Sequence, residues 1–120
     1  MAKVLIVDDS PTIVALLKKG LESDKCKIIT SDNGIDALTL ARKEMPDLML
    51  LDLMLPKMDG FHVCTMIKKD EKLKQIKVIM LTGRQDSDSK NLGLECGADK
   101  FITKDTDPLK IIEAANSMLP

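Results

Sequence analysis

The chain has 120 residues, a formal net charge of −1 at pH 7, and only two aromatic side chains, Phe61 and Phe101. Acidic and basic residues are interspersed, so no basic stripe indicates direct nucleic-acid binding, and aromatic residues that could stack on bases are nearly absent. No apolar run approaches the length of a membrane span, so an interaction within a membrane is not expected. The length is typical of one domain, over residues 1–120.

The cysteines are expected to bind no metal and to form no disulfide, and the single histidine is expected to be a bystander. Cys26, Cys64 and Cys96 lie in apolar patterns, and none belongs to a CxxC motif. They are interpreted as reduced thiols of a cytoplasmic protein. His62 is expected to be exposed on a short helix.

The first predicted strand is the apolar run of residues 4–7, which ends in Asp8 and Asp9. Ser10 and Pro11 then have the residue types of a helix N-cap and a first helical position. The apolar face of this helix is expected at Ile13, Leu16, Leu17 and Leu21. A shorter and more polar strand follows over residues 27–30. The next helix is expected to begin at Asp32, Asn33 or Gly34 and to end at Pro46. Its apolar face is Ile35, Leu38, Ala41 and Met45.

The third predicted strand, residues 48–52, has four apolar residues in a row before Asp52. An apolar run without alternation is typical of a strand that is covered on both faces of a parallel sheet. The turn-rich residues 56–60 follow the strand. A short helix is then predicted from Phe61, Cys64 and Ile67.

The fourth predicted strand, residues 78–81, ends in Thr82. A weak helix is predicted over residues 86–97, which have few apolar side chains and two glycines. The fifth strand, residues 100–103, ends at Lys104. Asp107 and Pro108 repeat the signal of an N-cap and a first helical position. The last helix is expected to bury Leu109, Ile112, Ala115 and Leu119.

Strict alternation of five strands with five helices, joined by short connections, predicts an α/β fold with a parallel sheet and helices on both faces. The first, third and fourth strands are the most apolar and belong in the middle, so the second and fifth belong at the edges. The resulting order, 2-1-3-4-5, is that of a flavodoxin-like doubly wound sheet.

In this arrangement several chemically active side chains meet at the carboxyl edge of the sheet: Asp8, Asp9, Asp52, Thr82 and Lys104. Three carboxylates this close repel one another unless they bind protons or a cation, and hard oxygen ligands suit Mg²⁺. The metal, the Lys104 ammonium and the Thr82 hydroxyl could together neutralise or bind the three oxygens of a phosphoryl group. Asp52, which ends a rigid strand, is then the natural nucleophile.

These residues and their spacing resemble the receiver domain of bacterial two-component response regulators, in the family's order and over essentially the whole chain. The motifs that carry the resemblance are Asp8-Asp9, Asp52 followed by Pro56-Lys57-Met58-Asp59-Gly60, Thr82-Gly83, and residues 97–104, GADKFITK. The resemblance implies that Asp52 accepts a phosphoryl group from a sensor histidine kinase or a phosphotransfer protein. The domain would be a cytoplasmic signalling switch that catalyses only its own phosphorylation and dephosphorylation, and so not a turnover enzyme.

The resemblance also implies the role of each site residue. Asp9, Asp52 and the backbone carbonyl of Met54 would hold Mg²⁺, or Mn²⁺ in its place, and Asp8 would act through water. Thr82 and Lys104 would bind the phosphoryl oxygens. Thr82 and Phe101 would form the switch, and residues 86–97, the fifth strand and the last helix would form the partner surface, with Ile111 partly exposed. A dimer that depends on phosphorylation is a further expectation.

One residue departs from the family pattern. Asp105 follows Lys104, where the family usually has a proline in a cis peptide bond. A cis bond without proline costs roughly 3–4 kcal/mol, so a trans bond is expected. This step is the one feature that favours an alternative, a receiver-like interaction module without phosphorylation.

Two enzyme classes are also alternatives. A phosphatase of the aspartate type needs a second acid two residues after its nucleophile, and Met54 occupies that position. A flavin protein of the same architecture needs a polar, glycine-rich phosphate loop after the first strand, where Asp8 and Asp9 would repel the phosphate.

Overall fold

The computed structural model describes residues 1–83 and 95–120, and these form a five-stranded parallel sheet in the order β2-β1-β3-β4-β5. The strands are β1 (Ala2–Val7), β2 (Cys26–Ser31), β3 (Leu48–Asp52), β4 (Lys77–Thr82) and β5 (Lys100–Thr103). The predicted strand order is confirmed, and every strand begins and ends within two residues of its predicted position.

Four helices lie in the described part of the chain: α1 (Pro11–Leu21), α2 (Gly34–Glu44), α3 (Gly60–Lys69) and α5 (Pro108–Ser117). Each begins after a residue whose side chain accepts a hydrogen bond from a backbone N–H of the first turn. These N-caps are Ser10, Asn33, Asp59 and Asp107. The helix predicted over residues 86–97 falls almost entirely outside the described residues and stays a prediction.

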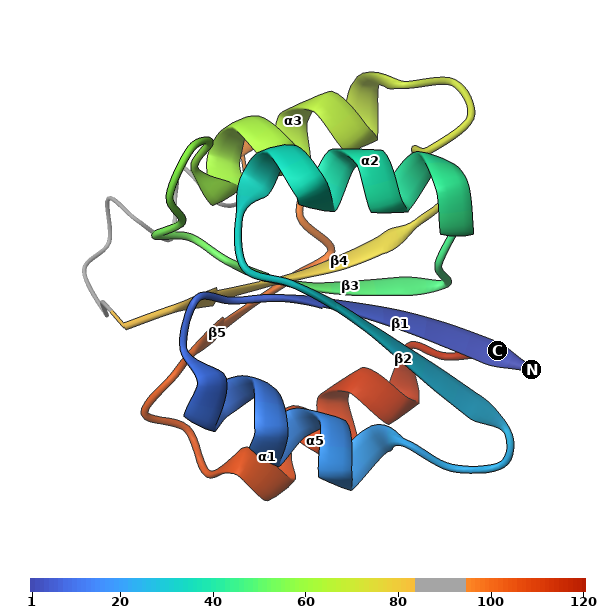
Figure 1. Ribbon diagram of the computed structural model, residues 1–120, viewed down its shortest axis with the longest axis vertical. Helices are drawn as coiled ribbons and strands as arrows, with labels where there is room; N and C mark the ends of the chain where they lie inside the picture. Colours follow the sequence, from blue (N-terminus) through green and yellow to red (C-terminus); the bar gives the residue numbers. More distant parts are fainter. Residues whose placement is uncertain (84–94) are drawn as a thin grey trace.

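The helices cover both faces of the sheet, as predicted. α1 and α5 lie on one face, and α2 and α3 lie on the other (Figure 1). Alternate side chains of the central strands fill the two cores. The core under α2 and α3 includes Leu5, Val7, Met49, Leu51, Val78 and Met80. The core under α1 and α5 includes Val4, Ile6, Leu48, Leu50, Ile79 and Leu81. All five residues of β3 are buried, which explains its unbroken apolar run.

The predicted helix faces were wrong at their margins. Leu16, Ile35, Met45 and Leu109 were expected inside, yet they are 47%, 48%, 48% and 67% exposed. In α5 Ala115 is buried as expected, but the second buried residue is Ile111, so Ile111 is not part of an exposed surface. Helical periodicity predicts that a helix has an apolar face. In α5 apolar residues lie on more than one side of the helix, and packing against the sheet decides which side is buried.

In the described part of the chain no helix has both the length and the hydropathy needed to cross a lipid bilayer. His62 is exposed, and its Nδ1 lies 3.0 Å from Oδ2 of the N-cap Asp59.

Candidate functional site

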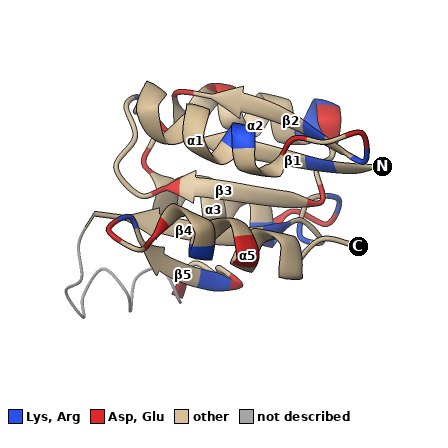
Figure 2. Ribbon diagram, turned by 90° about the horizontal axis from the view of Figure 1, so that it is seen from below, with Lys and Arg blue, Asp and Glu red and all other residues tan. Residues whose placement is uncertain are grey.

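Parallel pairing brings the predicted site residues to the same edge of the sheet. Val7 pairs with Leu51, and Asp52 pairs with Leu81. Because the strands run in the same direction, the residues that end or follow them all lie at one edge. The tip of the β3 arrow and the connection after β1 are acidic (Figure 2). The register therefore places Asp8 beside Asp52, as the sequence predicted.

Three carboxylates gather at this edge. Asp8, Asp9 and Asp52 each offer an oxygen, and these oxygens lie within 4.8 Å of one another. Asp8 and Asp52 are buried, with 2% and 3% of their surface exposed, whereas Asp9 is exposed. Buried carboxylates this close need counter-charge or protons, because water cannot solvate them.

Lys104 supplies one counter-charge. Its ammonium nitrogen lies 2.7 Å from Asp8 Oδ2 and 2.9 Å from Asp52 Oδ2. Its backbone N–H donates to the carbonyl oxygen of Thr82 at 2.6 Å, which holds the residue after β5 against the end of β4. The peptide bond between Lys104 and Asp105 is trans, as expected. The missing proline therefore does not keep Lys104 away from the site.

Burial, charges and hydrogen bonds at this edge shift the pKa values of Asp52 and Lys104. Burial raises the pKa of Asp52 and the Asp8 carboxylate adds to the rise, while hydrogen bonds from Lys104 and from the backbone of Met54 oppose it without cancelling it. Burial alone would lower the pKa of Lys104, but hydrogen bonds to Asp8 and Asp52 outweigh it, so that pKa is raised. Lys104 is therefore a firmly protonated cation.

The residues present fit a divalent cation. Three carboxylates and one ammonium have a formal sum of −2, which one such ion balances. Apart from the Lys104 ammonium, the buried Asp8 Oδ2 has no hydrogen-bond partner among the described residues. The donor set is all oxygen, which suits Mg²⁺ and Mn²⁺.

The connection after β3 is held tightly against Asp52. The backbone N–H of Met54 donates to Asp52 Oδ1 at 3.2 Å, while the Met54 side chain is 61% exposed. Gly60 donates its N–H to the carbonyl of Leu53 at 2.9 Å. A Cβ atom at Gly60 would overlap the backbone carbonyl oxygen of Asp52. In the sequence Gly60 is part of the motif after Asp52, and the one sign of this packing role is a glycine at the first position after the N-cap Asp59.

Thr82 and Phe101 lie on the same face of the sheet. Met80 pairs with Phe101, and Thr82 pairs with Thr103. Because side chains alternate along a strand, Thr82 and Phe101 are diagonal neighbours on the face covered by α2 and α3. Thr82 is fully buried, and Phe101 is half-buried against the core of that face.

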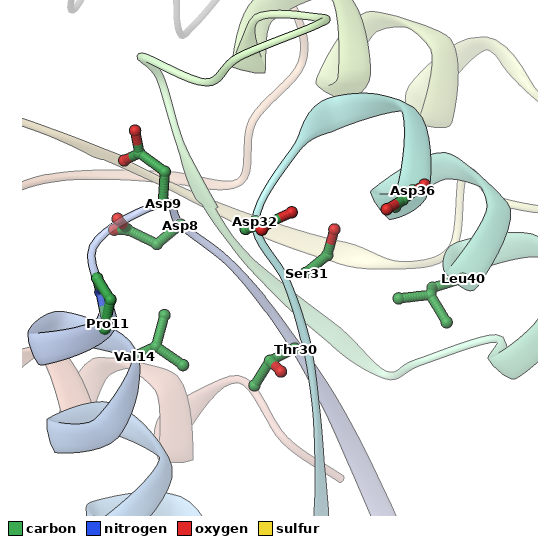
Figure 3. A pocket seen from close by; sticks show the side chains of 9 residues that line it. All are labelled: Asp8, Asp9, Pro11, Val14, Thr30, Ser31, Asp32, Asp36 and Leu40. Atoms are coloured by element: carbon green, nitrogen blue, oxygen red, sulfur yellow. The ribbon is translucent and has the colours of Figure 1, made fainter.

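A hollow of about 450 Å³ borders two of the three carboxylates, Asp8 and Asp9 (Figure 3). It lies between the start of α1, the end of β2 and the start of α2, and it extends the acidic edge to Asp32 and Asp36, which the sequence analysis did not single out. The side-chain amide of Asn33 donates to both of these carboxylates at 2.9 Å. The hollow is lined by Asp8, Asp9, Pro11, Val14, Thr30, Ser31, Asp32, Asp36 and Leu40.

A doubly wound sheet with buried carboxylates and one lysine at its carboxyl edge defines a phosphoacceptor signalling domain. Residues 4–116 match the family model of the response regulator receiver domain, and the chain belongs to this family. Receiver domains accept phosphoryl groups in two-component signalling, where they partner with histidine kinases, and they act as switches without substrate turnover.

Two relatives differ in how much of their own length this chain covers. The chain is 39% identical over 117 residues to the alkaline phosphatase synthesis transcriptional regulatory protein PhoP of Bacillus subtilis, covering 98% of this chain and 48% of PhoP. It is 35% identical over 119 residues to protein PilH of Pseudomonas aeruginosa, covering 99% of this chain and 98% of PilH. The chain thus spans about half the length of PhoP and nearly all of PilH.

Solved structures agree with the fold. The BeF₃-activated receiver domain of DrrB has a TM-score of 0.88 at 31% identity, with 98% of this chain and 97% of that chain covered. The Mn²⁺-bound form of response regulator Rcp1 has a TM-score of 0.83 at 27% identity, with 98% and 91% covered.

Proposed function

We propose that residues 1–120 form one receiver domain in which Asp52 is the phosphoacceptor, supplied by the phosphohistidine of a sensor histidine kinase or a phosphotransfer protein. The observation that carries this proposal is the position of the Lys104 ammonium, 2.9 Å from Asp52 Oδ2 and 2.7 Å from Asp8 Oδ2. A cation held against a buried carboxylate at a strand end is arranged to receive a negatively charged group.

The proposed transfer uses groups on the described residues. An Asp52 carboxylate oxygen attacks phosphorus, the bond between phosphorus and the donor's imidazole nitrogen breaks, and that nitrogen leaves with the electron pair. The Lys104 ammonium then binds one phosphoryl oxygen, and the Thr82 hydroxyl binds another. The β3 backbone holds Asp52 still, because Leu53 N–H donates to the Leu81 carbonyl at 2.9 Å.

Asp9, Asp52 and the Met54 carbonyl are proposed to hold Mg²⁺, with Asp8 acting through water. Asp9 is the exposed acid of the three, so its oxygens are open to a metal, whereas buried Asp8 faces Lys104. A bound divalent ion would neutralise charge on the phosphoryl group. Mn²⁺ is the alternative ion, and the structure of the relative Rcp1 contains it.

Phosphorylation is proposed to act through Thr82 and Phe101, the diagonal pair on the face under α2 and α3. The partner surface would include β5 and α5, together with residues 86–97, most of which lie outside the described part of the chain. A phosphorylation-dependent dimer would use the same surface and is testable by light scattering. A cytoplasmic location is part of the proposal, and the three free thiols agree with it.

Labelling with a small phosphodonor tests the acceptor. In Mg²⁺, intact-mass measurement should find one phosphoryl group that is stable in acid and labile in base. Asp52→Asn should abolish the label, because an amide is no nucleophile at this position. Asp32→Asn is the matched control, since Asp32 is an acid beside the site that the proposal does not use. Full labelling of Asp52→Asn would disprove the assignment.

Metal titration tests the ligands separately. Asp9→Ala removes a direct ligand and Asp8→Ala only an indirect one, so the first should weaken Mg²⁺ binding more than the second. Equal Mg²⁺ affinity of the wild type and Asp9→Ala would contradict the proposed ligand set.

A further inference from the structure

Two of the three cysteines, far apart in sequence, are in contact. Cys64 lies on α3 and is fully buried, and Cys96 lies just before β5 and is 8% exposed. The single proton of the Cys64 thiol can be donated to the Cys96 carbonyl oxygen, which lies 3.5 Å from the Cys64 sulfur, or to the neighbouring Cys96 sulfur. Neither belongs to the carboxylate edge, so their chemistry is separate from phosphoryl transfer.

Cys96 has the surroundings of an activated thiol. Its sulfur is within reach of the Cys64 proton and of the backbone N–H of Ala98, and the Lys68 ammonium is close enough to attract a negative charge on it. Lys68 is fixed in place, because its Nζ lies 2.7 Å from both the Ile76 carbonyl oxygen and Asp99 Oδ2. Donors and a cation around a sulfur stabilise its thiolate form.

The pKa shifts agree with this geometry. The hydrogen bond from Cys64 is the main cause that lowers the pKa of Cys96 to about 7, against the effect of burial. The same hydrogen bond, together with burial and with the nearby Asp99 carboxylate, raises the pKa of Cys64. One sulfur is thus prepared to attack while its neighbour keeps a proton.

Cys26 is separate from this pair and has different surroundings from Cys96. Burial and the Asp47 carboxylate raise its pKa. It lies in the core under α1 and α5, whereas Cys64 and Cys96 lie in the core under α2 and α3, on the other side of the sheet. The chain therefore contains its own control thiol.

We propose that Cys96 and Cys64 form a peroxide-oxidisable dithiol, in which Cys96 reacts first and Cys64 resolves. The Cys96 thiolate attacks one oxygen of hydrogen peroxide and breaks the O–O bond, giving Cys96 sulfenic acid and a hydroxide that takes up a proton. The Cys64 sulfur then attacks the sulfenic sulfur, the S–O bond breaks, and water leaves with the Cys64 proton. Two thiols lose two electrons and the peroxide gains them.

The disulfide would join α3 to the turn that leads into β5. α3 begins at Gly60, which packs against the backbone of Asp52, and β5 leads to Lys104. The bond would therefore connect two elements that both lead to the carboxylate edge. The inference does not depend on Asp52 being the phosphoacceptor.

Peptide mapping of the full chain after hydrogen peroxide treatment is the test. We expect an intramolecular Cys64–Cys96 disulfide, with Cys26 still a thiol. Cys96→Ser should abolish the disulfide and leave Cys64 unoxidised, whereas Cys64→Ser should leave a Cys96 sulfenic acid that dimedone traps. Cys26→Ser should form the Cys64–Cys96 disulfide at the wild-type rate.

A measurement on the wild-type protein avoids any variant that fails to fold. At pH 7, iodoacetamide should alkylate Cys96 at least about tenfold faster than Cys26 in the folded protein, because the surroundings of Cys96 favour its thiolate, whereas burial and the Asp47 carboxylate disfavour that of Cys26. Equal alkylation of the two, oxidation of Cys26 as fast as Cys96, or only intermolecular disulfides after peroxide would each overturn the proposal.

Discussion

The ammonium nitrogen of Lys104 lies 2.9 Å from Asp52 Oδ2 and 2.7 Å from Asp8 Oδ2. One cation therefore stands between two buried carboxylates. Without a metal ion, the Lys104 ammonium offsets part of the negative charge of both acids. Removing this one side chain should therefore lower the stability of the protein.

Lys104→Met removes this cation and keeps an unbranched side chain. The two carboxylates lose their counter-charge, so the free energy of unfolding of the metal-free protein is expected to fall by about 1–3 kcal/mol. Lys100→Met, at the exposed start of the same strand, should change it by less than about 0.5 kcal/mol. Urea denaturation with a chelator measures both. Equal losses in the two variants would contradict the counter-charge role.

Asp52 should also make stability depend on pH. Burial, with the Asp8 carboxylate, raises the pKa of Asp52 above its ordinary value of 3.8. Between 3.8 and the raised pKa, the folded state keeps a proton that the unfolded state has lost, so folding is favoured most at the acidic end. The stability of the wild type relative to Asp52→Asn should therefore fall as pH rises through this window and then level off.

Urea denaturation of the wild type and Asp52→Asn without metal, at several pH values between about 4 and 7, measures this difference. Subtracting the variant removes the other acids from the comparison, among them Asp59 and Asp99, whose pKa values are lowered. Mg²⁺ should stabilise the wild type more than the variant. If, in the presence of a chelator, the free energy of unfolding of the wild type rises relative to that of Asp52→Asn as the pH increases, the prediction is refuted.

Gly60 lies where no side chain fits. A Cβ atom there would overlap the backbone of Asp52 and approach Leu53 Cα. Because backbone atoms of a central strand cannot easily move aside, Gly60→Ala should destabilise the protein by about 1–3 kcal/mol and slow phosphorylation. At Gly83 an added Cβ meets no described atom within 4 Å, so Gly83→Ala is the matched control. Thermal unfolding checks both, and an equal effect of the two would disprove the packing argument.

The diagonal pair Thr82 and Phe101 gives a prediction about signal transmission. Beryllofluoride with Mg²⁺ imitates a phosphoryl group, and it should shift the amide resonance of Phe101 by drawing the Thr82 hydroxyl toward the site. Thr82→Ala should confine the shifts to the carboxylate edge. Thr39→Ala, which alters a hydroxyl on the exposed side of α2, should leave them as in the wild type. Shifts at Phe101 in Thr82→Ala equal to the wild type would exclude this route.

The fold was predictable because its strands and helix starts have clear sequence patterns. β3 has no polar residue before Asp52, and the N-caps Ser10 and Asp107 each stand before a proline. Parallel strands then fix which ends meet, so the strand order places Asp8, Asp52 and Lys104 at one edge of the sheet, whereas the contact of Asp8 with the Lys104 ammonium is a finding of the structure.

What the sequence could not predict depends on packing between distant segments. The overlap that excludes a side chain at Gly60, the exposure of Leu109 and the contact of Cys64 with Cys96 all depend on how helices lie on the sheet. Periodicity states which residues of a helix share a face. It does not state how far that face is rotated toward a neighbour.

Met54 is expected to influence how long the phosphoryl group stays on Asp52. Its side chain is 61% exposed, and its backbone N–H donates a hydrogen bond to Asp52 Oδ1. Hydrolysis needs a water in line with the bond from Asp52 to phosphorus. A thioether is a weak acceptor and no donor, so it cannot orient that water, and its flexible chain can cover the site. From the sequence, Arg84 is the second residue expected to flank this approach, and it has donors only; it lies outside the described residues.

Met54→Asn with Arg84→Glu supplies an amide and an acceptor, and it should speed dephosphorylation by about tenfold, equal to about 1.4 kcal/mol in the barrier. Met66→Asn, on the exposed side of α3, tests whether any methionine replacement has this effect. The measurement is phosphate release from purified phosphoprotein in Mg²⁺. If the double variant releases phosphate no faster than the wild type, then water access at these two positions does not set the lifetime. An equal acceleration by Met66→Asn would point instead to a general loosening of the fold.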